Sequence, residues 1–341
     1  MARKAPDRYI RWLALAGLAT LGGCGKCSEA VQWNGFNSPS QTSSASQTSN
    51  IPQTSGSAQS TPSPPKSPPA RTTDPAAAAL VDAAIVMVES TETISAKVRQ
   101  DVLLFGKRMV GSGSYAQQRT EDRTLMRWEM RWQHGDRSTS WVQVADGEYL
   151  WSHDTSKDPP LSRVDLRRAA RWLAENRTTA TPLDADARLW SVGLARLLRS
   201  LRATFDFRSA EPGRWGHDKR PVWRVIGTWH NASTPVAPTG NEGAAQQPGP
   251  LPLASLPNHV PTTVVLLLGQ NDMFPYRIEY RRDDGSESSA ARLGRLLVST
   301  DFHSVNINVE IPPERFAYQP GDTDWADPTE AYAKAAATPR R

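Results

Sequence analysis

Residues 125–133, with the sequence LMRWEMRWQ, constrain the fold of this chain more than any other stretch. Met126, Trp128, Met130 and Trp132 alternate with charged side chains over the whole segment. Because successive side chains of a strand point to opposite faces of a sheet, this period of two predicts a strand with one apolar and one charged face. Such a strand belongs in an antiparallel sheet that is buried on one side.

Several other stretches show the same alternation or the same enrichment in strand-forming residues. An Asp146-Gly147 pair, which is typical of a tight hairpin, separates two of them. The predicted strands are residues 93–104, 111–117, 137–145, 148–154, 220–229, 262–269, 275–282, 295–303 and 305–311. These segments predict an antiparallel meander followed by a second group of strands.

Three segments have helical features instead. Asp74 suits an N-cap and Pro75 the first position of an alanine-rich helix. Residues 162–176 and 184–205 place Val164, Val192 and several leucines at helical spacing. The order of helix, strands, helices and strands predicts an α+β domain over residues 76–320, with a Pro/Gly/Ala-rich loop insertion near 231–260. We expect residues 321–341 to form a flexible tail.

Residues 1–23 have the three parts of a bacterial lipoprotein signal peptide. Four basic residues precede an apolar stretch at 12–21, and the sequence LGGC ends at Cys24. The apolar stretch is shorter than the roughly 20 residues of a transmembrane helix. We expect cleavage before Cys24 and attachment of fatty acyl chains, such as palmitate, to its thiol. An ordinary secreted chain with an incidental cysteine, or a Cys24–Cys27 disulfide, is the alternative.

The segment after the predicted cleavage site is a tether in this interpretation. Residues 24–75 are rich in Ser, Thr, Gln and Pro and contain too few apolar residues to offset the entropy of ordering. They would hold the domain on the periplasmic side of the cell envelope. Gly25 follows Cys24 where an Asp retains enterobacterial-type lipoproteins in the inner membrane, so we expect the outer membrane.

The chain lacks the motifs of common enzymes. Its six histidines are scattered, no G-x-S-x-G motif occurs, and the acidic cluster at 321–330 lacks the ligand spacing of an EF-hand. The 40 basic residues are interspersed with 35 acidic ones, which gives a net charge of +5 without a basic run. We therefore expect no catalytic activity, no metal or other cofactor, and no nucleic-acid partner.

Two longer segments resemble the LolA/LolB-like superfamily of lipoprotein carriers and lipid-binding envelope proteins. They are RTLMRWEMRW followed by VADGEYLW, and FPYRIEYRRDDG followed by VNINVEIPPERFAY, with Pro312 and Phe316 in a terminal P-x-x-x-F pattern. The resemblance covers residues 76–318. It implies an open antiparallel half-barrel sheet with helices covering its concave face, and a cavity that receives acyl chains.

The resemblance also implies roles for individual residues. Trp128, Met130 and Trp132 would line the cavity, although an apolar stripe of this kind also fits a packed core. Arg123 lies near the position of a basic residue that assists release of cargo in carriers, and a solvent-exposed arginine is the alternative.

Two functions stay open from the sequence. The chain could be an anchored acceptor or carrier of lipid or lipoprotein, or an envelope sensor that uses the same fold to bind a protein partner. Sensors of the superfamily add a second domain after the half-barrel, whereas few residues follow Pro312 here. We therefore expect the lipid-binding type.

Overall fold

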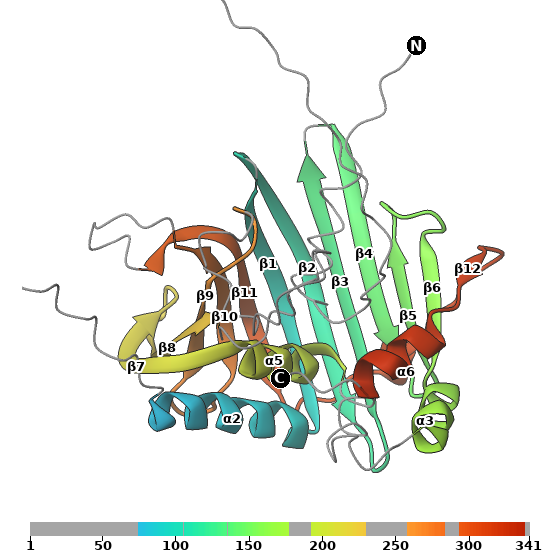
Figure 1. Cartoon of the computed structure of the whole chain (residues 1–341), viewed down its shortest axis with the longest axis horizontal. Coiled ribbons are helices and arrows are strands. Elements are labelled where there is room, and N and C mark those ends of the chain that lie inside the picture. The colour runs from blue at the N-terminus through green and yellow to red at the C-terminus, as the bar shows by residue number, and fades with distance from the viewer. Residues whose placement is uncertain are drawn as a thin grey trace, which may run out of the picture. The chain divides into compact units, whose positions relative to one another are not determined.

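A computed structural model shows a single open sheet with helices against one of its faces (Figure 1). The structure describes residues 74–104, 106–134, 136–176, 192–229, 258–283 and 293–337. The predicted signal peptide, almost all of the tether and most of the predicted insertion therefore lie outside the described residues. The α+β class and the open half-barrel architecture expected from the sequence are confirmed.

The sheet contains twelve strands in the order β12-β6-β5-β4-β3-β2-β1-β11-β10-β9-β8-β7. Every neighbouring pair is antiparallel except β12 and β6, and the two end strands β12 and β7 do not pair with each other. The strands are β1 (Thr93–Leu104), β2 (Lys107–Arg119), β3 (Thr124–His134), β4 (Arg137–Ala145), β5 (Tyr149–Asp154), β6 (Leu161–Asp165), β7 (Phe205–Trp215), β8 (Arg220–Trp229), β9 (Thr263–Gly269), β10 (Pro275–Arg282), β11 (Arg295–Ile307) and β12 (Trp325–Ala326).

Four helices and one 3-10 turn accompany the sheet in the described part of the chain. They are α2 (Pro75–Ser90), α3 (Leu166–Glu175), α5 (Gly193–Thr204), α6 (Thr329–Ala337) and η4 (Pro313–Phe316). The predicted cap of the first helix is confirmed, because the Asp74 carboxylate accepts a hydrogen bond of 2.9 Å from the Ala76 N–H. A cap of this kind satisfies one of the N–H groups that lack a partner in the first helical turn.

The face of the sheet that packs against α2 and α5 is called the inner face below, and the opposite face the outer face. Helix α2 packs on α5, β7 and β8, and α5 packs on β3 and β7. Figure 1 shows the helices across one end of the strands, with β1–β4 running past them. The inner face carries most of the main hydrophobic core, which extends from the buried side of α2 to the aromatic residues of β10 and β11.

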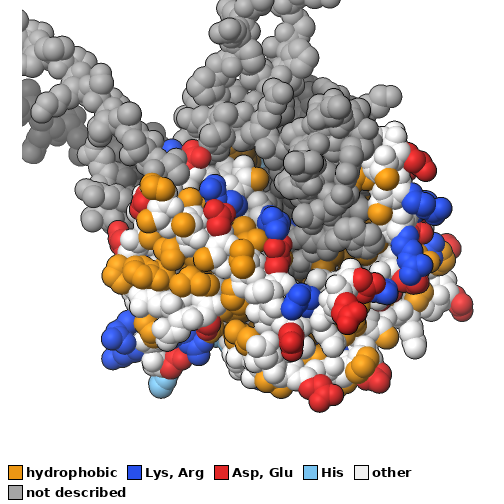
Figure 2. Space-filling view, turned by 90° about the horizontal axis from the view of Figure 1, so that it is seen from below, with side chains coloured by type: hydrophobic (Ala, Val, Ile, Leu, Met, Phe, Trp, Pro, Cys, Tyr) orange, Lys and Arg blue, Asp and Glu red, His pale blue; other side chains and the backbone are white. Residues whose placement is uncertain are grey.

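Helix α2 is apolar on its outward side as well. Pro75, Ala76, Ala79, Ala83 and Val86 are exposed, and Val86 has an exposed fraction of 63%. Figure 2, seen from the helix end of the sheet, shows hydrophobic side chains gathered on the left, where Figure 1 places α2. The sequence of α2 is therefore apolar around most of its circumference, unlike the amphipathic helices α3 and α5.

The helix predicted at 162–176 begins too early, and residues 184–191 of the helix predicted at 184–205 lie outside the described residues. Residues 162–165, including Val164, belong to strand β6, and the helix begins at Leu166 because the Asp165 carboxylate caps the Arg168 N–H at 2.8 Å. In the segment 184–205 the described helix begins at Gly193, with Val192 as its N-cap residue. The backbone is extended at Asp165 and at Val192, so each of these residues is the N-cap of the helix that follows it.

Strand β7 was not predicted, and the strand predicted at 295–303 continues through residue 307 as one strand, β11, whereas residues 308–311 of the strand predicted at 305–311 lie outside it. Strand β7 contains Pro212 and Gly213, which are disfavoured inside a sheet, but as an edge strand it can accommodate them. In β11, Ser304 adopts a positive φ of 48° where β11 contains one extra residue relative to its partner β1, as in a β-bulge.

The prediction of a flexible tail over residues 321–341 is wrong for most of that segment. Helix α6 packs on α3 and β6, and its Tyr332 side chain is completely buried. Asp327 accepts hydrogen bonds from the Thr329 N–H and hydroxyl at 3.1 and 2.6 Å, so the acidic cluster supplies a helix cap. The burial of Tyr332, Ala333 and Ala336 provides the apolar contact that orders the segment.

Candidate functional site

The inner face of β3 carries the four side chains that the sequence alternation singled out. Met126, Trp128, Met130 and Trp132, called the inner stripe below, all have exposed fractions of 5% or less. The predicted orientation is therefore confirmed. Burial suits both a packed core and the wall of a ligand cavity, so the predicted lining role of Trp128, Met130 and Trp132 stays a prediction.

Trp128 lies at the centre of an aromatic cluster that four strands contribute to. Its ring meets the Tyr115 ring edge to face at 5.4 Å, the Trp141 ring at 5.9 Å and the Phe302 ring at 6.2 Å. None of these three partners was predicted from the sequence as a site residue. Trp141 could have been found from the alternation of residues 137–145, but the contact with Phe302 depends on the pairing of β1 with β11.

Glycines on β2 provide the space in which two residues of the inner stripe lie. A Cβ atom at Gly111 would clash with the Trp132 ring, and one at Gly113 would lie 2.8 Å from the Met130 sulfur. The register places Gly111 opposite Trp132 and Gly113 opposite Met130. The larger side chains of β3 therefore lie against bare backbone of β2, which widens the apolar surface of the inner face.

Hydrogen bonds attach the helices to one end of this face. The Tyr115 hydroxyl donates to Gln117 Oε1 at 2.6 Å and accepts from the Leu194 N–H of α5 at 3.1 Å. Gln117 Nε2 donates to the Val88 carbonyl of α2 at 2.8 Å. Burial raises the pKa of Tyr115, so its hydroxyl keeps the proton that it donates. These contacts hold both helices at the Met126 end of the inner stripe.

The other end of the stripe contains a second polar connection. The Trp132 indole N–H donates to Gln100 Oε1 at 2.9 Å, and Gln100 Nε2 donates to the Thr300 hydroxyl at 3.1 Å. All three residues are buried. The indole N–H groups of Trp128 and Trp141 are also buried, but they have no hydrogen-bond partner in the described part of the structure.

Arg123 lies outside the inner stripe, in the turn between β2 and β3. Its Nε is 3.2 Å from Asp122 Oδ1, and its side chain packs on Gly147 of the β4–β5 turn so closely that a Cβ atom there would clash. Two turns at the same end of the sheet are thereby joined. A role of Arg123 in the release of cargo stays a prediction.

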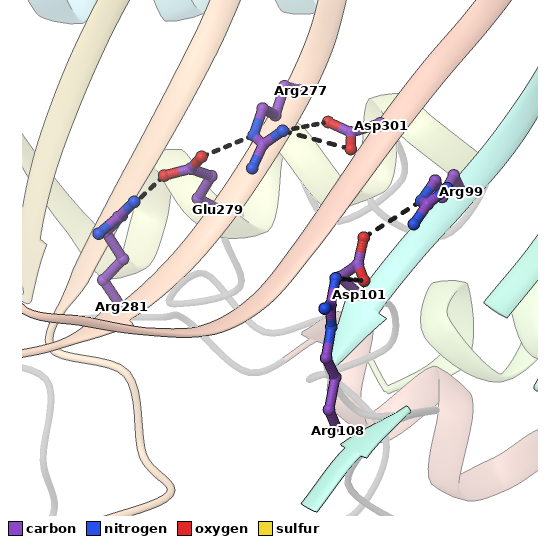
Figure 3. A network of polar contacts seen from close by, with 7 residues as sticks. All are labelled: Arg99, Asp101, Arg108, Arg277, Glu279, Arg281 and Asp301. Atoms are coloured by element: carbon purple, nitrogen blue, oxygen red, sulfur yellow. Dashed lines mark hydrogen bonds and ion pairs between the residues drawn. The ribbon is translucent and has the colours of Figure 1, made fainter. Parts of the chain in front are cut away.

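The outer face of the neighbouring strands carries a network of ion pairs, shown in Figure 3. Arg277 is 2.6 Å from Glu279 and 3.0 Å from Asp301, and Arg281 is 2.7 Å from Glu279. On β1, Asp101 pairs with Arg99 and Arg108 at 3.2 and 2.8 Å. Side chains of opposite charge thus alternate across β10, β11 and β1.

Two aspartates of this network have pKa values shifted in opposite directions. Burial raises the pKa of Asp301 above its ordinary value of 3.8, although the neighbouring Arg277 opposes the shift. Burial also acts on Asp101, but hydrogen bonds from Arg108 and Arg99 outweigh it and hold the pKa of that carboxyl below 3.8. The deeper burial of Asp301 and the second arginine partner of Asp101 together give the two shifts their opposite signs.

The described residues contain neither a cluster of three or more His, Cys, Asp or Glu side chains suited to a metal ion nor a helix long and apolar enough to cross a membrane. The predicted lipid-attachment residue, Cys24, lies outside the described residues.

Comparisons with known proteins give matches among solved structures only. No protein-family model and no curated protein matches the chain. A chain of the Pseudomonas aeruginosa MucA/MucB complex is 11% identical, with a TM-score of 0.37, and the match covers 72% of this chain and 61% of that one. The present chain thus spans less than two thirds of that relative.

Two further structures match over nearly their whole length. The Mycobacterium tuberculosis lipoprotein LppX is 12% identical with a TM-score of 0.32, over 70% of this chain and all of LppX. A LolA superfamily protein from Nitrosomonas europaea is 10% identical with a TM-score of 0.25, over 72% of this chain and 98% of that one. These identities and scores are low, and the function proposed below depends on the residues of this chain.

Proposed function

We propose that this protein is a membrane-anchored envelope lipoprotein that binds the acyl chains of a lipid or lipoprotein on the inner face of its sheet. The observation that carries the proposal is the apolar inner stripe on an open sheet. Helix α5 starts beside Met126, where a Cβ atom at Gly193 would lie 2.9 Å from Met126 Cγ. Trp132 lies six residues farther along β3, roughly 20 Å away at about 3.4 Å per residue.

The side chains of the stripe suit a flexible apolar ligand. Methionine has an unbranched, polarisable thioether that adapts to irregular neighbours, and tryptophan supplies a large apolar area. Met130 and Trp132 lie against glycines of β2, so this part of the face is built from adaptable side chains over bare backbone. A face of this composition can change its shape around acyl chains without moving the strands.

The proposal includes attachment to a membrane through Cys24. The lipoprotein signal at 1–23 supports it, as does the tether composition of the following segment. Two or more acyl chains anchor a protein stably, whereas one does so only weakly. With Gly25 after the cysteine, we place the protein on the periplasmic side of the outer membrane, as an acceptor or carrier. Replacement of Cys24 by Ala should abolish labelling by an alkyne fatty acid in cells.

Binding is tested with the Cys24→Ser chain, which carries no lipid of its own. The neutral hydrophobic dye Nile red is titrated into three forms of this chain. One has an unchanged inner face, one carries Thr139→Trp and one carries Ser138→Trp. Thr139 pairs with Trp132 on the inner face, and Ser138 is the adjacent outward residue. We expect a Kd in the micromolar range, about −8 kcal/mol. Thr139→Trp should weaken binding at least tenfold, and Ser138→Trp should leave it unchanged.

The result can contradict the proposal in two ways. Equal binding by both tryptophan variants would place the dye away from the inner face. A chain that is folded but binds no dye would leave the inner stripe as packed core, and the sensor that binds a protein partner would then be the better function.

A further inference from the structure

Three indole N–H groups of the described residues are buried without an acceptor, and two of them, those of Trp128 and Trp141, are neighbours on the inner face. The indole N–H groups of Trp128 and Trp141 have no partner among the described residues, and the exposed fractions of these two side chains are 5% and 6%. Buried polar groups in folded proteins almost always have a partner, because an unpaired donor loses its hydrogen bond to water without replacement. Two unpaired donors on one face need an explanation.

Trp132 shows that the same face can satisfy an indole. Its N–H donates to Gln100 Oε1 at 2.9 Å, although Gln100 is 32 residues away in sequence. Trp128 and Trp141 lie on adjacent strands with ring centroids 5.9 Å apart. The register places Trp128 opposite Gln143, which is also buried. The unpaired donors are therefore neighbours, and they adjoin a third buried polar side chain.

The charges next to these tryptophans favour an uncharged acceptor. Asp154 is the register partner of Trp141 on β5 and has an exposed fraction of 2%. Its Oδ2 is 3.3 Å from Lys157 Nζ, and its Oδ1 accepts hydrogen bonds from the N–H and hydroxyl of Ser156. This ion pair has no net charge to attract a ligand carboxylate, and the Asp154 carboxylate itself repels one at low dielectric.

We propose that the Trp128 and Trp141 indole N–H groups donate hydrogen bonds to the carbonyl oxygen of a neutral acyl ester held on the inner face. This inference rests on the proposed function and narrows it, because it selects esterified acyl chains over free fatty acids and over plain hydrocarbons. A carbonyl oxygen has two lone pairs and can accept from both donors. The ester group then lies at the centre of the inner stripe.

The experiment measures displacement of Nile red from the Cys24→Ser chain by methyl palmitate, palmitate and heptadecane, each delivered from cyclodextrin. We expect methyl palmitate to displace the dye at concentrations at least fivefold lower than the other two. In the Trp128→Phe and Trp141→Phe variants this preference should fall about threefold or more, because each variant keeps the aromatic ring and loses one donor. Trp151→Phe is the matched control, since its N–H already donates to Asp146 Oδ2 at 3.0 Å and its ring packs with Val144 and Leu161 outside the inner stripe, and it should keep the preference.

A second measurement reads the donors directly. In protein labelled with ¹⁵N at the indoles, methyl palmitate should shift the Trp128 and Trp141 N–H proton resonances downfield, and heptadecane should not. An ester preference unchanged in both phenylalanine variants, with those two resonances unmoved, would overturn this inference while dye binding still upheld the proposed function. If the Cys24→Ser chain with an unchanged inner face bound no dye at all, both this inference and the proposed function would be overturned.

Discussion

The inner and outer faces of the same strands are stabilised in different ways. On β11, Phe302 points inward and is completely buried among aromatic rings, while the adjacent Asp301 points outward into an arginine–carboxylate network. The inner face gains free energy from apolar area removed from water, which depends little on pH or salt. The outer face depends on charges that must be matched, and its contribution is small wherever the pairs are exposed.

Burial therefore has opposite effects on stability at the two faces. On the inner face it stabilises the apolar side chains and penalises only the unpaired indole N–H groups. On the outer face, Glu279 and Asp301 have exposed fractions of 9% and 6%, and burial there penalises the charged form. Those carboxylates are tolerated because Arg277 lies between them. Removing a neighbour should therefore affect the two faces differently.

The largest effect is expected from deletion of an inner aromatic ring. Phe302→Ala should lower the free energy of unfolding by about 3–5 kcal/mol, because it leaves a cavity beside Trp128, Tyr115 and Phe274. The control is the exposed Lys97, next to Val98. Lys97→Ala should change the free energy of unfolding by less than about 0.5 kcal/mol. Urea denaturation measures both, and similar losses for the two variants would contradict the assignment of the faces.

A smaller loss is expected on the outer face when a buried carboxylate pair loses its arginine. Arg277→Met keeps the aliphatic volume but leaves Glu279 and Asp301 without their shared cation, so we expect a loss of about 2 kcal/mol. Arg224→Met breaks an exposed pair with Glu211 and should cost less than about 0.5 kcal/mol. If the two variants were equally stable in urea, the network would be a surface feature without buried charge.

The two kinds of indole on the inner face should differ by about 1 kcal/mol. Trp132→Phe leaves Gln100 Oε1 buried without its donor. The unpaired oxygen lowers the free energy of unfolding by about 1–3 kcal/mol, in addition to the loss from the smaller ring. Trp128→Phe removes an N–H that has no partner, so only the loss of ring area counts. Thermal or urea unfolding of the ligand-free chain measures the difference. A larger loss from Trp128→Phe would indicate a hidden acceptor for its indole.

The smallest effect is a pair of opposite pH dependences on the outer face. The folded-state pKa of Asp301 is raised, so its contribution to stability is present below pH 3.8 and is lost as pH rises through the raised value. The folded-state pKa of Asp101 is lowered, so its contribution is present above pH 3.8 and is lost as pH falls through the lowered value.

Unfolding free energies at pH 3, 4, 5 and 6 test this difference. The advantage of wild type over Asp301→Asn should shrink as pH rises, and its advantage over Asp101→Asn should shrink as pH falls. If the stability advantage of wild type over both variants changed with pH in the same direction, the pKa values of Asp301 and Asp101 would not be shifted in opposite directions.

The sequence by itself determined where most strands lie and which side chains share a face. In β3 the alternation of apolar and charged residues predicts the inner stripe, because the two-residue period is a property of any single strand. Asp74 and Pro75 likewise predict the start of α2, since a helix cap involves only residues within one turn. Edge strand β7 was missed because Pro212 and Gly213 interrupt its pattern.

Only the tertiary structure decided which side chains find partners. Gln100 reaches Trp132, Arg277 lies between Glu279 and Asp301, and α6 covers β6 through the register of strands far apart in sequence. The same register leaves Trp128 and Trp141 side by side without acceptors. Local patterns determine the face of a residue, but long-range pairing determines its neighbours, because hydrogen bonds and ion pairs act only over a few ångströms.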